Sequence, residues 1–182
     1  MLYISIEFAP PRLSKYSKYR TVSHRQLQKI VKLSTKSMGG RAGTRFNAII
    51  SLAFFVLLQL GEYCVTKQKH HLLQLNLIIH SDGIEITFET CKFFSSPVKV
   101  TLKKSYAIAC PIKCMRKYLN LHQQQSEEPL LEVSTPEFRR DVNGIGRVAQ
   151  ITDGITPHAL KRVGTTCYSD SGWSDAKICA HG

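Results

Sequence analysis

The segment TPHALKR, from Thr156 to Arg162, combines residues that open a helix with residues that hold an anion. Thr156 is a good N-cap and Pro157 suits the first helical position, so a helix is predicted to begin here. His158 then lies in the first turn, and Lys161 and Arg162 follow one turn later. Because a helix N-terminus attracts negative charge, the segment predicts a phosphate-binding site, with a purely capping role for the histidine as the alternative.

The positive charge of the chain is concentrated near its N-terminus. The 182 residues contain 25 Lys and Arg against 13 Asp and Glu, a formal net charge of +12, and residues 1–46 hold ten of the basic residues beside one acidic residue, Glu7. This excess favours a polyanionic partner, foremost double-stranded DNA. A basic face with no partner is the alternative. Binding to an anionic membrane or to RNA is not favoured, because the sequence has no amphipathic stripe for a membrane and no aromatic stacking motif for RNA. The residues predicted to contact DNA are Arg12, Lys15, Lys18, Arg20, Arg25, Lys29, Lys32, Arg41, Arg45 and Arg162.

The cysteines and the apolar segments argue against several classes of protein. The opening residues do not have the pattern of a secretory signal, so the six cysteines predict reduced intracellular thiols rather than disulfides. Only Cys110 and Cys114 are closely spaced, and neither a zinc site nor any cofactor is predicted. The apolar run from Ala48 to Leu60 is thirteen residues long, whereas about twenty are needed to cross a bilayer. It therefore predicts a buried core helix.

Hydrophobic periodicity predicts the order of the secondary structure. A helix at 23–33 is expected to bury Leu27, Ile30 and Val31, and a break at 37–43 separates it from the buried helix. The remaining predictions are an end of the buried helix near 61–63, strands at 72–79, 84–88 and 98–102, and helices at 110–122, at 134–151, from 156, and after Gly172. The predicted fold class is α+β, mainly helical, with a small three-stranded antiparallel sheet.

This order of elements, with four short motifs, resembles the catalytic domain of tyrosine recombinases, the phage-integrase-like family. The likeness is greatest to the branch in eukaryotic mobile elements of the crypton and DIRS types. LLQLGEY at 57–63 matches the LR-x-GE motif that closes a buried helix, and Lys92 matches the lysine of the hairpin turn. HALK at 158–161 matches H-x-x-R, and Gly172 with WSDAKI at 173–178 follows in the family's order.

The resemblance covers residues 46–182 and leaves residues 1–45 as a basic helical arm or the remnant of an N-terminal DNA-binding domain. It implies a reaction in which a tyrosine attacks a DNA phosphate and forms a 3′-phosphotyrosyl link. Two arginines hold the phosphate oxygens, a lysine protonates the leaving 5′-hydroxyl, and histidines assist. No metal or cofactor is needed, because the covalent link keeps the energy of the broken bond.

The implied catalytic residues are Lys92, His158, Lys161 and Gln59, which the resemblance brings together around a shallow basic cleft. Gln59 stands where the family has its first arginine, and Lys161 where it has the second, with Arg162 one position along. Among the tyrosines only Tyr168 follows His158, and the family's nucleophile would lie beyond the last residue. The resemblance therefore implies a truncated or degenerate recombinase with little or no strand transfer.

A non-catalytic DNA-binding module derived from a mobile-element recombinase is the alternative function. Double-stranded DNA is the predicted partner in both cases, no membrane is expected to be involved, and a homo-oligomer on DNA stays open. The expected location is the nucleus if the source is eukaryotic, and otherwise the inside of the cell.

Overall fold

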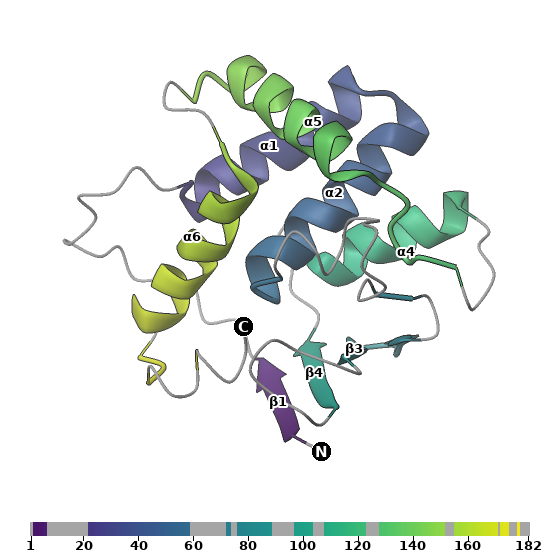
Figure 1. Ribbon diagram of the computed structural model, residues 1–182, viewed down its shortest axis with the longest axis vertical. Coiled ribbons are helices and arrows are strands. Elements are labelled where there is room, and N and C mark those ends of the chain that lie inside the picture. Colours follow the sequence, from purple (N-terminus) through teal and green to yellow (C-terminus); the bar gives the residue numbers. More distant parts are fainter. Residues whose placement is uncertain are drawn as a thin grey trace.

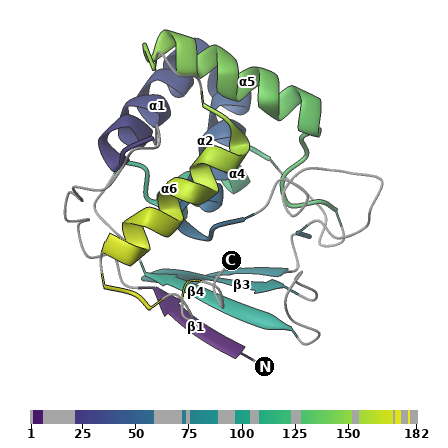
Figure 2. The ribbon, with the colours of Figure 1, turned by 60° about the vertical axis from the view of Figure 1, so that its left-hand side comes forward.

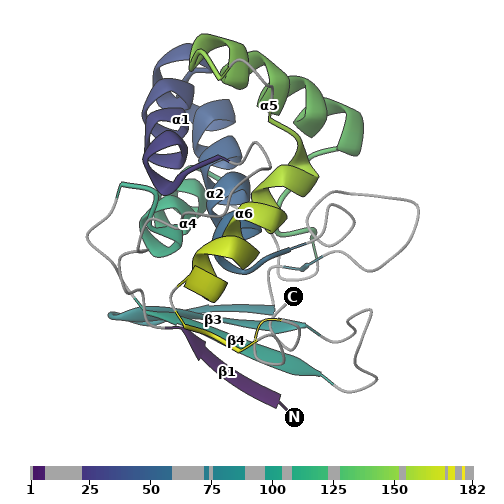
Figure 3. The same ribbon diagram turned by 90° about the vertical axis from the view of Figure 1, so that its left-hand side faces the viewer.

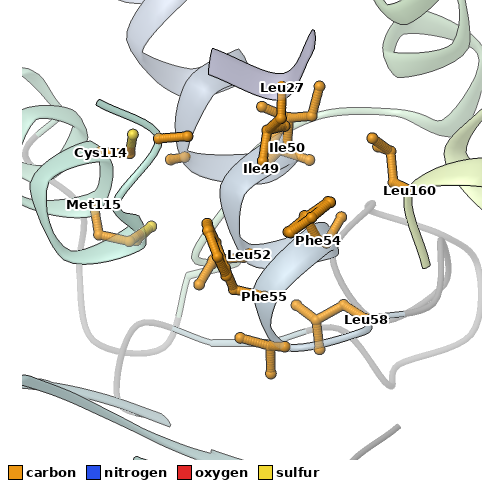
Figure 4. Close-up of a cluster of buried hydrophobic side chains, with 14 of the residues drawn as sticks. Leu27, Ile49, Ile50, Leu52, Phe54, Phe55, Leu58, Cys114, Met115 and Leu160 are labelled. Carbon is orange, nitrogen blue, oxygen red and sulfur yellow. The ribbon is translucent and has the colours of Figure 1, made fainter. Parts of the chain in front are cut away.

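The computed structural model describes residues 2–6, 22–58, 72–73, 76–88, 97–103, 108–122, 128–151, 155–170, 172–174 and 178. The long apolar run becomes α2 (Gly40–Phe55), the central helix, in which every residue after Ala42 except Arg45 is buried. Three helices pack around it, namely α1 (His24–Ser37), α4 (Pro111–Leu121) and α6 (Pro157–Asp170). Figure 4 shows Leu27 of α1, Met115 of α4 and Leu160 of α6 gathered around α2.

Both ends of α2 differ from the prediction. The break expected at 37–43 is confined to Met38 and Gly39, because Gly39 takes a positive φ of 79° and the helix begins at once with Gly40. The other end was expected near residues 61–63, but the helix finishes at Phe55. Leu57 follows with a φ of 57°, a left-handed conformation that ends the helical hydrogen bonding. This position is usually a glycine, so the sequence gives no sign of the helix end.

The predicted first helix is confirmed as α1. Ser23 is its N-cap, and the side chains of Ser23 and Gln26 bond each other's backbone N–H in a capping box. Leu27, Ile30 and Val31 are buried, as their spacing predicted. The expected boundary between residues 45 and 46 falls inside α2, and α1 contributes to the same core.

The predicted antiparallel meander is also confirmed, with β2 (Leu77–Ile79), β3 (Gly83–Phe88) and β4 (Val98–Lys103) in register. A fourth strand, β1 (Leu2–Ile6), was not predicted; it pairs in parallel with β4 and gives the order β1-β4-β3-β2. The helices lie over one face of this sheet (Figure 2). Alternate residues of β3 and β4 are buried.

The first strand of the meander is shorter than predicted. The expected strand was 72–79, but β2 begins only at Leu77. Leu73 and Asn76 instead close a turn, because the Leu73 N–H donates to Asn76 Oδ1 at 2.9 Å and the Asn76 N–H donates to the Leu73 carbonyl at 3.1 Å. An asparagine side chain that forms hydrogen bonds to nearby backbone groups competes with the hydrogen bonds between strands, and the strand therefore starts later.

The remaining helices follow the prediction closely. In α4, Met115 and Tyr118 are fully buried. The next helix is α5 (Thr135–Val148), which is capped by the Ser134 side chain and crosses over α1 (Figure 1). After Gly172 the Ile178 N–H donates to the Ser174 carbonyl at 3.0 Å, as at a helix start, while most of that predicted helix lies outside the described residues.

Candidate nucleic-acid interface

The N-terminus of α6 has the structure that the sequence predicted. Thr156 Oγ1 accepts a hydrogen bond from the Ala159 N–H at 3.1 Å, and Pro157 is the first helical residue. His158 is exposed in the first turn, and on the same face Lys161 is half-buried and Arg162 is exposed. An exposed histidine and two cations at a positive helix end form an arrangement that can bind a phosphate group.

Close contact with α2 fixes the position of α6. A Cβ atom added at Gly164 would lie 2.2 Å from the carbonyl oxygen of Phe54, so only a glycine lets the two backbones approach this closely. Leu160 and Val163, in the turn before Gly164, are buried. The helix that presents His158 is therefore anchored to the centre of the molecule.

Tyr168, the one tyrosine that follows His158 in the sequence, has a structural role. Its ring is buried and stacks on Trp173 with 4.6 Å between the ring centroids. The hydroxyl donates a hydrogen bond to the Phe55 carbonyl. Burial raises the pKa of Tyr168 above its ordinary value, so the phenol is a poorer nucleophile than a free tyrosine.

Two of the predicted catalytic residues, Gln59 and Lys92, lie outside the described residues. The structure therefore places His158 and Lys161 but does not bring the predicted set of four together. Leu58, the last described residue before Gln59, is buried. The basic cleft around these residues stays a prediction.

Six of the ten predicted DNA contacts are described, five of them on α1 and α2. Arg25, Lys32 and Arg41 are exposed. Lys29 donates through Nζ to the Ala149 carbonyl at 2.8 Å and so caps the end of α5. The sixth, Arg162, is on α6, and the contacts predicted for Arg12, Lys15, Lys18 and Arg20 fall outside the described residues.

Arg45 makes internal contacts between α2 and the start of α5. Its guanidinium pairs with the Glu137 carboxylate and donates to the Glu132 carbonyl at 2.6 Å. These bonds give Arg45 a structural role in the fold, and they would compete with the predicted contact to DNA.

Sequence reasoning overlooked two exposed arginines on α5. Arg139 and Arg140 lie on the solvent side of a helix whose buried side holds Phe138, Val142 and Ile145. The signal was present in the sequence, since a basic pair beside helically spaced apolar residues predicts an exposed cationic face.

In the part of the chain that the structure describes, no three His, Cys, Asp or Glu side chains gather as metal ligands would. Cys110, Cys114 and Cys167 do not form disulfide bonds with one another. No helix within the described ranges has the length and apolar content needed to cross a membrane.

Comparison with known proteins identifies the fold. No protein-family model matches the chain, and no curated protein matches its sequence. Several solved structures match, and two of them are similar over 90% of the chain. XerH site-specific recombinase, bound to its difH substrate in a pre-cleavage complex, has a TM-score of 0.66 and 13% identity, and XerA recombinase has 0.58 and 19%.

The chain has the fold of the tyrosine-recombinase catalytic domain. It spans about half the length of both recombinases, 46% of the XerH chain and 55% of the XerA chain. At these identities the likeness shows the architecture alone. It confirms the predicted fold class, and the roles of individual residues rest on their own geometry.

Proposed function

We propose that this protein binds double-stranded DNA as a degenerate relative of the tyrosine recombinases, derived from a mobile element of the crypton or DIRS type. The observation that carries the proposal is the N-terminal turn of α6, where His158, Lys161 and Arg162 lie on one face near the positive end of the helix, within a recombinase fold. The similar XerH is described with its DNA substrate, which supports DNA as the ligand of this fold. We further propose an intracellular location, and the nucleus if the source is eukaryotic.

The same helix end explains how a DNA phosphate would be bound. The His158 imidazole donates a hydrogen bond to a phosphate oxygen, while Lys161 and Arg162 supply positive charge near the positive end of the helix. Lys161 is a point charge and does not offer the planar fork with which arginine grips two oxygens. This arrangement suits binding better than stabilisation of a transition state.

Two features support weak or absent strand transfer. Gln59, at the position that the family resemblance assigns to an arginine, is neutral, and the loss of one preorganised donor typically costs about 10²–10³ in rate. Tyr168 would have to give up its bond to the Phe55 carbonyl and its stack on Trp173 before it could attack a phosphate. A non-catalytic DNA-binding module is the second candidate, and the burial of Tyr168 is the observation that favours it.

Binding is tested by fluorescence anisotropy of a labelled duplex against salt concentration. Replacing His158 and Arg162 together with glutamine should weaken binding about tenfold and reduce the slope of log K against log salt by about one. Lys103→Gln is the matched control, because it removes one exposed charge from the end of β4 and leaves α6 unchanged. Equal losses in both variants would mean that general charge, and not the end of α6, binds the duplex.

A deletion of residues 1–46 is not a clean test of the basic N-terminal segment. It would remove β1, all of α1 and the start of α2, and with them part of the core. Substitution of exposed residues such as Arg25 and Arg41 by glutamine removes charge and keeps the fold. We expect each to weaken DNA binding uniformly across sequences.

Catalysis is tested with a nicked suicide substrate and a denaturing gel. We expect no covalent adduct from the 182-residue chain, and Gln59→Arg should strengthen phosphate binding without producing one. An adduct that disappears in Tyr168→Phe would identify an active enzyme and refute the hypothesis that the protein is a degenerate recombinase.

A further inference from the structure

Three neighbouring helices of the core contain basic residues but no acidic ones. The sequences of α1, α2 and α4 include no Asp or Glu. Because these helices pack together, their positive charges share one region of the molecule. The basic residues are Arg25, Lys29, Lys32 and Lys36 on α1, Arg41 and Arg45 on α2, and Lys113, Arg116 and Lys117 on α4.

A pocket of about 400 Å³ opens between these three helices. Lys32 and Thr35 line it from α1, Asn47 from α2, and Lys113 and Lys117 from α4. None of the lining residues belongs to α6, and α4 and α6 lie on opposite sides of α2 (Figures 1 and 3). The pocket is therefore separate from the phosphate site proposed at the start of α6.

The wall between α1 and α2 is held in place by hydrogen bonds. Asn47 donates through Nδ2 to Thr35 Oγ1 at 2.9 Å and to the Val31 carbonyl at 3.2 Å. Gly43 brings the helices together, since a Cβ atom at this position would lie 2.9 Å from the Ser34 carbonyl oxygen. Fixed walls mean that a ligand would enter a largely preformed site, with little ordering cost.

The opposite wall combines charge with apolar surface. Lys113 and Lys117 are four residues apart on α4, so both lie on one face and repel each other. No carboxylate lines the pocket among the described residues, and neither Lys32 nor Lys117 forms an ion pair with any of them. Cys114, which also lines the pocket, is a neutral thiol, because burial raises its pKa to about 11.

We propose that this pocket binds a small phosphate-bearing molecule, with its phosphate among the ammonium groups of Lys32, Lys113 and Lys117 and its uncharged part against Val31 and Ile108. Lysine ammonium groups are phosphate binders, and the volume is within the usual range of small-ligand pockets, about 300–1,000 Å³. A concave pocket of this size suits a small molecule better than the convex backbone of a duplex. The proposal does not depend on the function assigned to α6.

The test is calorimetric titration of pyrophosphate and of AMP into the 182-residue chain at low salt. Lys32→Gln/Lys117→Gln should weaken the binding of both probes by at least about tenfold, because each removed ammonium group loses a charge-assisted hydrogen bond. Lys103→Gln/Arg147→Gln is the matched control, since it removes the same charge from exposed sites outside the pocket, and it should change affinity by less than about twofold.

Three results would overturn the proposal. The first is that neither pyrophosphate nor AMP binds at millimolar concentration. The second is that the pocket variant and the control variant lose affinity for these probes to the same extent. The third is a pocket variant that loses affinity for duplex DNA and keeps its affinity for pyrophosphate and AMP, which would assign these lysines to a second DNA-binding face. All four substituted residues are exposed, so both variants should retain the thermal transition of the parent chain.

Discussion

Replacement of Gly164 by alanine should separate α6 from α2. The added methyl carbon would lie 2.2 Å from the Phe54 carbonyl oxygen and 2.4 Å from Leu57 Cδ2. The leucine methyl can rotate away, but the carbonyl belongs to the backbone of α2 and cannot move without displacing the helix. Overpacking of this kind typically costs about 1–3 kcal/mol, and the severity of this contact argues for the upper end.

Alanine also favours the helix, and this gain opposes the clash. In a helix interior alanine is better than glycine by about 1 kcal/mol. The net loss in the free energy of unfolding is therefore about 2 kcal/mol, which for a chain of this length lowers Tm by about 4–8 °C. Circular dichroism during thermal unfolding measures the shift directly.

Gly144→Ala provides the matched control. Gly144 is in α5, and a Cβ atom added there would meet nothing within 4 Å. The same substitution should therefore raise the free energy of unfolding by about 0.5–1 kcal/mol through helix propensity alone. If Gly164→Ala matched this gain, or left Tm unchanged, α6 would not approach α2 as closely as described.

Three further outcomes follow from buried groups. Tyr168→Phe should cost about 1–2 kcal/mol in chemical denaturation, because it removes the bond to the Phe55 carbonyl, and an unchanged midpoint would contradict that bond. Burial, and then the nearby Glu137, raise the pKa of Asp141 in the folded chain, so ionisation of this carboxyl lowers the free energy of unfolding as pH rises above 3.8. Asp141→Asn should therefore raise Tm slightly at pH 7, and the gain should disappear below pH 3.8, where the carboxyl is neutral in the parent chain. Burial raises the pKa of Cys114 to about 11, so peptide mapping should show slow alkylation of this thiol in the native chain up to pH 9; rapid modification at pH 8 would show that the thiol is not buried. The stability linked to this shift is present below pH 9 and should be lost as pH rises through 11.

The parts of the fold that could be predicted from the sequence depend on local periodicity. The spacing of Leu27, Ile30 and Val31 fixes the buried side of α1, and the alternation of apolar residues fixes the meander. The end of α2 could not be predicted, because Leu57 takes a positive φ that its residue type does not favour. The shortening of β2 depends on the orientation of one side chain, Asn76, which periodicity does not describe.

The candidate site was predictable to the same extent. Thr156 and Pro157 announce the start of α6, so the exposure of His158 in its first turn could be expected. The bond between Tyr168 and the Phe55 carbonyl joins residues far apart in the chain and has no local signal. Such contacts depend on how helices pack, which no short motif encodes.

The sequence predicts that residues 1–45 form a basic helical arm or the remnant of an N-terminal DNA-binding domain, and the structure places several of their basic residues on helices that pack in the core. Six of the ten lie on α1 and α2, and two of these six, Lys29 and Arg45, join α5 to the core. Composition counts charges along the chain and cannot show that a cation also caps a helix or pairs with a carboxylate. For these two residues, loss of charge and loss of stability are expected to go together.

The pairing of β1 with β4 has a consequence for the order in which the chain folds during its synthesis. Leu2 pairs with Val98 and Ile6 with Leu102, so β1 must wait for β4, which is synthesised about a hundred residues later. At roughly 5–20 residues per second this wait lasts on the order of 5–20 seconds. During that time the backbone N–H and C=O groups of β1 have no strand partner, and once β4 forms, its outer edge stays open until β1 arrives. Among the described strands, β1 is thus made first and placed only after β4, and newly made chains have the greatest opportunity to pair with one another at this edge.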